Sequence, residues 1–144
     1  MSSDVPVEVA IAILPCDGKF LMQLRDNIPT ILYPGLWGLF GGHIEAGETP
    51  EVAVEREILE EIGFQIKVPQ KFGCYSDNRI IRHVFYAPLT VALDELVLGE
   101  GWDFGLISPV EIESGFAYSS AAGEKRPLGA VHQQITIDFI KWWG

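Results

Sequence analysis

The pattern of hydrophobic and polar positions predicts strands on both sides of one strong helix. Residues 7–14 are rich in Val and Ile and predict a buried strand, and after an Asp-Gly turn residues 20–25 alternate as a hairpin partner would. Residues 27–34 hold two prolines and predict a loop. Residues 36–40 predict a short strand that ends at Gly41-Gly42, where the backbone is free to turn.

The strongest helical signal covers residues 50–62. Thr49 is a suitable cap, and Pro50 suits the first turn because its missing N–H would have no helical partner there. Ala, Val, Glu, Arg, Ile and Leu carry the helix onward, and Gly63 is expected to end it.

The second half of the chain predicts further strands and a closing helix. Residues 65–75 and 80–93 favour strands, and residues 96–106 favour a strand, a loop and another strand. Residues 109–113 predict a short helical turn, and residues 130–143 carry apolar side chains at helical spacing. This order predicts the α/β class, with a central mixed sheet and helices on both faces.

Length and charge narrow the classes of protein that fit. With 144 residues and no repeat or linker, residues 1–144 are expected to form a single domain. A formal net charge of −10 disfavours binding to duplex nucleic acid or to an anionic membrane. No apolar stretch approaches the roughly 18 residues that a membrane span needs. Two cysteines without metal-ligand spacing, and no export signal, predict a soluble protein of the reducing cytoplasm.

Acidic side chains concentrate in and just before the predicted helix. Seven of the twenty Asp and Glu residues lie between Glu45 and Glu61, where Arg56 is the only cation. At about 100° per residue, Glu57, Glu60 and Glu61 share one helix face, and their like charges repel. A solvated acidic face is the ordinary interpretation of such a run. The neighbouring Ile and Leu residues favour a divalent cation instead, because Mg²⁺ binds carboxylates, water and substrate phosphates.

The segment around these glutamates resembles a known motif. Residues 42–64 read GHIEAGETPEVAVEREILEEIGF. They match the Nudix box, G-x5-E-x7-R-E-U-x-E-E-x-G-U with U a bulky apolar residue, at every specified position. The chain therefore resembles the Nudix hydrolases, in particular their MutT-like members. This resemblance implies an α/β/α sandwich with a central mixed sheet, and hydrolysis of a nucleoside diphosphate linked to another group.

The resemblance further implies a metal site for Mg²⁺ or Mn²⁺. By their places in the motif, Glu57, Glu60 and Glu61 would be metal ligands, and the Gly41 carbonyl is a further ligand in some members. A distal glutamate before a late strand often completes the site in MutT-like relatives. Glu100 is the candidate for that position, although no motif assigns it.

The same resemblance implies the catalytic groups. Arg56 would hold Glu48 in a bidentate pair that fixes the loop against the helix, with Glu48 near the metals. Glu57 would act as general base or orient the attacking water, a role that other members give to other residues. The protein would otherwise position the water in line and stabilise the spreading negative charge.

Substrate-binding residues lie outside the box. Arg25 resembles the arginine of a Gln-Arg pair that meets the base or the phosphates in MutT-like members, and a strand-end arginine paired with an acid is the equal alternative. Tyr33 is a candidate for stacking on a base, and Arg79 for contact with phosphate or ribose, although a core or surface role fits each as well. Further candidates of the same kind are Trp37, Tyr75, Arg82 and Phe85.

Two functions of different class remain open. One is a pyrophosphohydrolase of a small nucleotide, either a nucleotide sugar such as ADP-ribose or a nucleoside triphosphate. The other is a sensor that binds a nucleotide on the same fold without cutting it. The intact set of helix carboxylates favours the hydrolase, because a sensor does not need them. Homodimers are common in the family, so a homodimer is a further expectation with no interface assigned.

Overall fold

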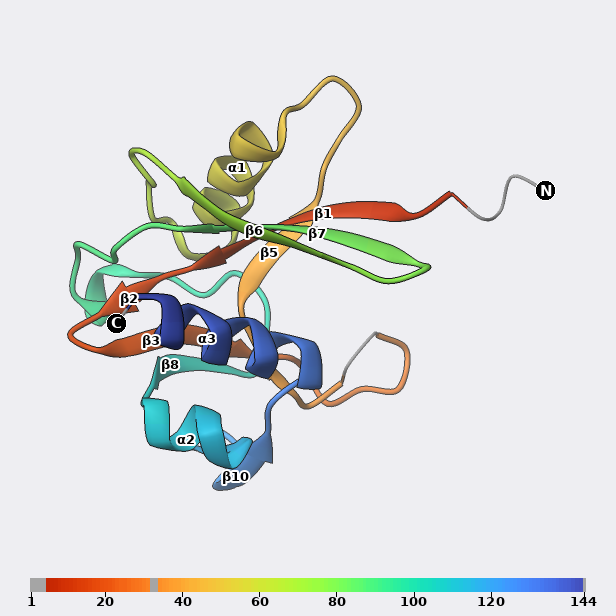
Figure 1. The fold of residues 1–144 in the computed structure, drawn as a ribbon. Coiled ribbons are helices and arrows are strands. Elements are labelled where there is room, and N and C mark those ends of the chain that lie inside the picture. The colour runs from red at the N-terminus through yellow and green to blue at the C-terminus, as the bar shows by residue number, and fades with distance from the viewer. Residues whose placement is uncertain (1–4, 32–33, 144) are drawn as a thin grey trace.

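The computed structural model describes residues 5–31 and 34–143 and is layered around a mixed sheet (Figure 1). The strand order of that sheet is β5 (Phe40–His43), β1 (Val7–Ile13), β7 (Ile80–Tyr86) and β6 (Gln70–Ser76). β1 runs parallel to β7, and the other pairs are antiparallel. The helix α1 (Pro50–Ile62) lies above this sheet, and the remaining elements lie below it (Figure 1). The expected α/β sandwich with a central mixed sheet is confirmed.

A second sheet lies on the face of the mixed sheet that α1 does not cover. Its strands are β2 (Pro15–Cys16), β3 (Lys19–Leu24), β4 (Trp37–Gly38) and β8 (Asp103–Ile107). β3 is its central strand, because β8 pairs along β3 while β2 and β4 pair with its opposite ends. The helices α2 (Pro109–Ser114) and α3 (Ala130–Trp143) lie on the same side of the molecule (Figure 1). The sequence pattern did not separate these strands from the mixed sheet.

α1 begins and ends where the sequence predicts. The hydroxyl of Thr49 accepts a hydrogen bond from the Val52 N–H at 3.2 Å, so the cap satisfies a donor that the first turn leaves unpaired. Gly63 ends the helix in the left-handed conformation, with φ of 71°. The helix buries Ala53, Val54, Ile58 and Ile62 against the mixed sheet. Glu57 and Glu61 lie on the sheet side of the same helix, next to the glycines of β5.

The strand predicted over residues 36–40 is wrong at both ends. The chain forms two short strands there, and β5 continues through Gly41 and Gly42 instead of ending at them. Both glycines pair with β1, opposite Ile11 and Ala10. A side chain at Gly41 would overlap the carbonyl oxygen of Ala10, so the close approach of the two backbones requires glycine.

Three other strands are shorter than predicted. β6 begins at Gln70, after a proline that has no N–H for strand pairing, and β7 ends at Tyr86, shortly before Pro88. No strand forms at residues 96–102. Val97 and Gly99 instead donate backbone hydrogen bonds to the last carbonyls of α1, at 3.1 and 2.8 Å. These two hydrogen bonds hold residues 97–99 against the end of α1, although the apolar pattern predicts a strand there.

A hairpin of β9 (Phe116–Ser119) and β10 (Glu124–Pro127) was not predicted at all. Its strands have four residues each, too few for a clear alternation of polar and apolar positions. The guanidinium of Arg126 donates to the carbonyl of Gly35 at 3.1 Å, which ties the hairpin to the loop after β3. Among the described residues, no helix is both long and apolar enough to cross a membrane.

Two of the residues considered for base stacking belong to the core. Trp37 is 2% exposed and Phe85 1% exposed, so neither presents a ring to a ligand, and that interpretation is wrong for both. Tyr75 lies against α3, where its hydroxyl donates to the Asp138 carboxylate at 2.8 Å. Burial and the Asp138 carboxylate raise the pKa of Tyr75 to about 12.

Candidate active site

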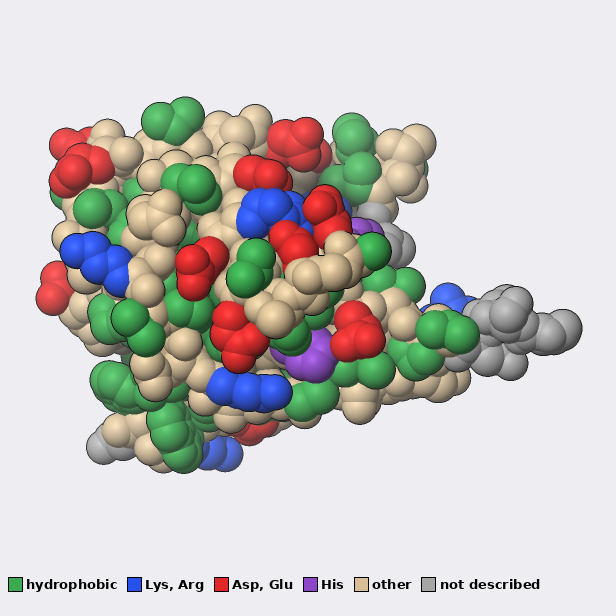
Figure 2. Space-filling model, turned by 90° about the horizontal axis from the view of Figure 1, so that it is seen from above, with side chains coloured by type: hydrophobic (Ala, Val, Ile, Leu, Met, Phe, Trp, Pro, Cys, Tyr) green, Lys and Arg blue, Asp and Glu red, His purple; other side chains and the backbone are tan. Residues whose placement is uncertain are grey.

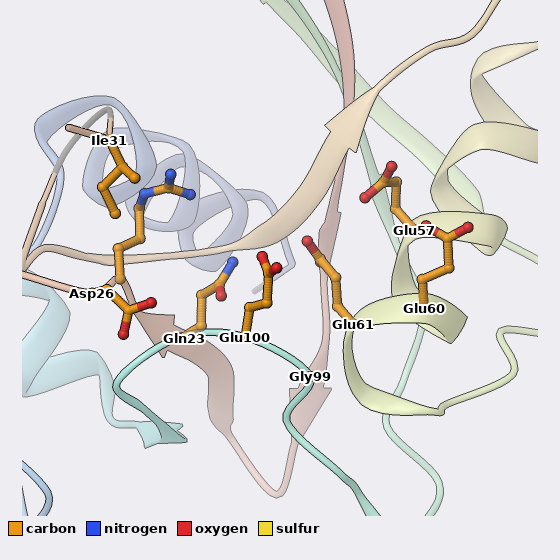
Figure 3. A pocket seen from close by; sticks show the side chains of 10 residues that line it. Gln23, Asp26, Ile31, Glu57, Glu60, Glu61, Gly99 and Glu100 are labelled. Carbon is orange, nitrogen blue, oxygen red and sulfur yellow. The ribbon is translucent and has the colours of Figure 1, made fainter. Parts of the chain in front are cut away.

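A cavity of about 430 Å³ opens between α1, the end of β3 and the segment before β8. The glutamates of α1 form one wall, and Asp26 and Ile31 lie across from them (Figure 3). The lining residues are Gln23, Arg25, Asp26, Ile31, Glu57, Glu60, Glu61, Gly99, Glu100 and Gly101. The cavity therefore brings together residues from three distant parts of the chain.

Arg56 fixes the loop before α1, as the sequence predicts. Its Nε and Nη2 donate to the two carboxylate oxygens of Glu48 at 2.6 and 2.9 Å, which is a bidentate pair. Nη2 also donates to the carbonyl of His43 at 3.1 Å, so the same side chain holds the end of β5. The hydrogen bond from Arg56 and one from the backbone of Glu45 lower the pKa of Glu48 to about 2. Glu48 is therefore ionised throughout the neutral range.

The third nitrogen of the same guanidinium contacts the glutamates of α1. Nη1 donates to Glu57 at 2.9 Å and to Glu60 at 3.3 Å. The hydrogen bonds to Glu48 and Glu57 and the nearby charges of Glu57 and Glu45 raise the pKa of Arg56 above its already high value. Acidic side chains gather around basic atoms on the α1 face of the molecule (Figure 2). Arg56 thus offsets part of the repulsion that these carboxylates would otherwise exert on one another.

The two glycines of β5 shape the space beside α1. A side chain at Gly42 would overlap the carboxylate of Glu57 and force that group to move. The N–H of Gly41 donates to Glu61 at 3.2 Å, which orients the Glu61 carboxylate toward the strand. The first glycine of the Nudix box therefore leaves room for the Glu57 carboxylate at the position where it contacts Arg56.

Glu61 is the most perturbed carboxylate of the cavity. Burial and the neighbouring charge of Glu57 raise the pKa of Glu61 to about 8, although the hydrogen bond from Gly41 and the charge of Arg25 act in the opposite direction. A buried carboxylate next to a second carboxylate is stabilised by a cation that both can share.

Glu100 reaches the cavity because the segment before β8 is attached to the end of α1. Gly99 donates to the carbonyl of Glu61 at 2.8 Å, and Gly101 has φ of 115°, a conformation that favours glycine. Figure 3 shows the side chains of Glu100 and Glu61 pointing into the same part of the cavity. The structure thus brings the candidate distal glutamate to the predicted site.

The donor groups of the cavity suit a hard divalent cation. Glu57, Glu60, Glu61 and Glu100 supply carboxylate oxygens, the ligand type that Mg²⁺ and Mn²⁺ prefer. As placed, no group of three or more His, Cys, Asp or Glu residues within 5–31 and 34–143 is gathered closely enough to hold an ion. Glu57 and Glu60 instead contact Arg56, so binding an ion would require these two carboxylates to turn from the guanidinium.

The predicted substrate-binding residues have different outcomes. Arg25 lines the cavity. Arg79 is exposed in the turn between β6 and β7, where its N–H donates to Asp77 at 2.7 Å, and it does not line the cavity. Tyr33 lies outside the described residues. The sequence reasoning missed Gln23 of β3, which lies two positions before Arg25 and also lines the cavity.

The family of the chain follows from comparison with known proteins. A family model described as the NUDIX domain matches residues 5–115. The chain belongs to the NUDIX family.

The relatives that the chain matches are named after different substrates. The chain is similar to the ADP-ribose pyrophosphatase of Methanocaldococcus jannaschii, with 42% identity over 49% of this chain and 40% of that protein. It is also similar to the nucleoside triphosphatase NudI of Salmonella arizonae, with 45% identity over 35% of each chain. The matched segment thus spans less than half the length of either relative.

Solved structures with the same fold include the MutT protein of Methanosarcina mazei Go1. It aligns with a TM-score of 0.75 and 19% identity over 98% of this NUDIX chain and 97% of that one. A bifunctional NMN adenylyltransferase/ADP-ribose pyrophosphatase from Francisella tularensis, complexed with AMP and a Mn ion, aligns with a TM-score of 0.71. Its identity is 22%, over 100% of this chain and 44% of that chain. At these identities the likeness concerns the fold.

Proposed function

We propose that this NUDIX chain is a cytoplasmic, single-domain pyrophosphohydrolase over residues 1–144. It uses Mg²⁺ or Mn²⁺ to cleave a nucleoside diphosphate linked to another group. The observation that carries the proposal is the cavity in which three glutamates of α1 and Glu100 face Arg25. A pyrophosphate needs cations on its oxygens and a positioned water, and this cavity provides groups for both.

The carboxylates of Glu57, Glu60, Glu61 and Glu100 would hold the metal, with the Gly41 carbonyl as a further ligand. A bound divalent cation would neutralise phosphate oxygens and lower the pKa of a coordinated water. The side chains of the protein would bind the substrate, hold the carboxylates in place and accept the proton of the attacking water.

Glu57 is the proposed general base. It lies at the wall of the cavity, and its carboxylate is fixed between Gly42 and the guanidinium of Arg56. Its role is to accept a proton from the attacking water and to aim that water at phosphorus. Arg56 and Glu48 position Glu57 through their bidentate pair and contribute no reacting atom.

Arg25 is the proposed phosphate ligand at the opposite wall. Its guanidinium is the only cationic group among the residues that line the described cavity, and it can bind phosphate oxygens through two N–H groups. Arg79 is exposed and outside this cavity, so the proposed contact of Arg79 with ribose or phosphate would have to be made by a part of the substrate that extends beyond it.

A hydrolysis panel with Mg²⁺ tests this proposal. The substrates are ADP-ribose, nucleotide sugars, dinucleoside polyphosphates and nucleoside triphosphates, with products separated by chromatography. AMP with a sugar phosphate would assign a nucleotide-sugar hydrolase, and a nucleoside monophosphate with pyrophosphate would assign a triphosphatase. The variants are Glu60→Gln, which should abolish turnover, and Glu51→Gln on the exposed first turn of α1, which should not. Metal and nucleotide binding without any product would contradict the proposal and favour a sensor.

A further inference from the structure

The loop that follows β3 carries part of the cavity lining. Arg25, Asp26 and Ile31 come directly after the strand and line the cavity, and Figure 3 shows Asp26 and Ile31 across from the glutamates of α1. Backbone hydrogen bonds close the base of this loop. The N–H of Gly35 donates to the carbonyls of Arg25 and Asp26, both at 3.2 Å, and the N–H of Arg25 donates to Leu36 at 3.0 Å. A shift of Gly35 would therefore move the residues with which the loop begins.

The side chain of Arg126 in β10 lies against the backbone of Gly35. Its Nε donates to the Gly35 carbonyl at 3.1 Å. A Cβ at Gly35 would overlap Nη2 of Arg126, and Gly35 has φ of 68°, so both the close approach and the backbone conformation favour glycine. The side chain of Arg126 is 21% exposed, so the protein encloses most of it. This enclosed contact fixes the end of the loop to the hairpin.

The same guanidinium contacts a second segment next to the cavity. Its Cζ lies 5.6 Å from the centre of the Trp102 ring, within the range of a cation–π contact. Trp102 follows Glu100 and Gly101, which line the cavity from the segment before β8. The N–H of Trp102 donates to the carbonyl of Leu24 at 2.8 Å, so this segment is also tied to the end of β3. Arg126 thus contacts both the loop after β3 and the segment before β8.

The hairpin that carries Arg126 is itself attached to buried groups. Arg126 pairs with Ala117 across the hairpin, and the Ala117 carbonyl accepts a hydrogen bond from the buried indole of Trp37 at 3.0 Å. Ser119 is 1% exposed and donates its hydroxyl to Asp103, the first residue of β8, at 2.7 Å. Arg126 therefore extends from a fixed base and can hold the loop in one place.

The remaining contact of Arg126 is an ion pair at the surface. Nη1 lies 2.9 Å from the carboxylate of Glu124, whose side chain is 55% exposed. Water screens such a pair, and its contribution is small. The contacts with Gly35 and Trp102 therefore account for the position of the guanidinium. Arg126 is not among the residues that line the described cavity, so it acts on the cavity through these two neighbours.

We propose that Arg126 is a positioning residue for substrate binding. It holds the loop after β3 so that Arg25 and Asp26 face the carboxylates of α1, and it contacts no part of the substrate. This inference rests on the proposed function, because Arg25 is the proposed phosphate ligand of that reaction. Arg126 lies beyond the segment that matches the NUDIX family model, so the Nudix box does not imply this role.

The proposal requires an effect on binding and not on the chemical step. Without the contact to Gly35, the loop would occupy more positions, and the substrate would have to order Arg25 when it binds. Arg56 holds the loop before α1 and contacts Glu57 independently of this hairpin. The groups proposed for the chemical step would therefore keep their places.

Steady-state kinetics of Arg126→Met test this division. Methionine keeps an apolar side chain over Trp102 and removes the donors, so KM for the best substrate of the panel should rise about tenfold with kcat within about twofold. Arg126→Lys keeps the charge and one donor and should raise KM by about threefold. Lys125→Met removes the neighbouring exposed cation of the same strand and should leave KM unchanged. A fall in kcat at constant KM, or equal KM values for Arg126→Met and Lys125→Met, would overturn the proposal.

Hydrogen exchange of single backbone amides tests the contact without any substrate. The amides of Arg25 and Gly35 close the loop base, and they should exchange about tenfold faster in Arg126→Met. The amide of Ile58, in the interior of α1, should exchange at the wild-type rate. Unchanged exchange at Arg25 and Gly35, or faster exchange with no change in KM, would overturn the proposal.

Binding of pyrophosphate with Mg²⁺ separates this inference from the proposed reaction. The dissociation constant is measured for the wild type, Arg25→Ala and Arg126→Met. Binding that is weaker by about fivefold in both variants supports the positioning role, even if no substrate of the panel is hydrolysed. Weaker binding in Arg25→Ala alone contradicts it, even if the hydrolase activity is found.

Discussion

The two walls of the cavity are built in different ways. The α1 wall consists of one continuous segment, from Gly41 to Gly63, in which Arg56 holds the loop, the strand and the glutamates together. The rest of the lining combines the end of β3 and the loop after it with residues 99–101, which precede β8. The first wall is therefore local in sequence, whereas the second exists only in the folded chain.

The two walls also differ in charge, and this difference indicates that they have different roles. The α1 wall carries three glutamates, and the rest of the lining carries Arg25 together with Asp26 and Glu100. Carboxylates suit metal ions, and a guanidinium suits the phosphate oxygens of a nucleotide. The local wall would thus supply the chemistry common to the family, and the assembled wall would select the substrate.

The largest effect is expected from changing the α1 wall at Glu61. Glu61→Gln removes a proposed metal ligand, so kcat/KM should fall by about 10³-fold or more, which corresponds to roughly 4 kcal/mol. The free energy of unfolding should not decrease, because burial already disfavours the ionised carboxylate in the folded state. Steady-state kinetics and urea unfolding measure the two quantities. Activity within tenfold of the wild type would remove Glu61 from the site.

The next effect concerns the dependence of stability on pH. Burial and the charges of Arg82 and Arg25 lower the pKa of His132 from 6.5 to about 4 in the fold, so between these values the unfolded chain binds more protons than the folded chain. The free energy of unfolding should therefore fall as the pH drops from about 6.5 to about 4, by at most roughly 3 kcal/mol.

Glu61 contributes a slope of the opposite sign. Its pKa is raised from 4.5 to about 8, so its contribution to stability decreases as the pH rises between these values. Comparison of urea unfolding for the wild type and His132→Asn isolates the histidine, because Asn does not titrate. An identical pH dependence for both proteins would show that the pKa of His132 is not lowered in the folded chain.

A smaller effect is expected from Arg56→Lys, which tests how the α1 wall is held. Lysine retains the charge but cannot form the bidentate pair with Glu48 or reach His43 and Glu57 at the same time. Stability should fall by about 1 to 2 kcal/mol and kcat by about tenfold, with KM little changed. Arg79→Lys, in an exposed turn, is the matched control and should leave both quantities unchanged.

The smallest effect separates the two arginines proposed for substrate binding. Arg25→Ala should raise KM by about tenfold, because Arg25 lines the cavity, and Arg79→Ala should change KM by less than about twofold. Initial-rate kinetics with the best substrate of the panel give both values. A larger effect at Arg79 would mean that the substrate extends to the turn between β6 and β7.

The sequence predicted the α1 wall more accurately than the rest of the cavity. The limits of α1 and the Arg56–Glu48 pair were predicted correctly because caps, helical spacing and the Nudix box are local patterns. Of the two strands predicted within residues 96–106, the first does not form, because Val97 and Gly99 donate hydrogen bonds to the carbonyl groups at the end of α1. Arg79 was a candidate on residue type alone, and its place in an exposed turn could not be read from the chain.

The sequence by itself determined the family, the central helix and the side chains available for metal binding, because each depends on residues within a few turns of one another. Only the tertiary structure decided which distant residues share the cavity. Glu100 enters it because Val97 and Gly99 donate hydrogen bonds to the helix end, and Arg25 and Asp26 enter it from the end of β3. These contacts depend on strand register and backbone approach, which spacing along the chain does not encode.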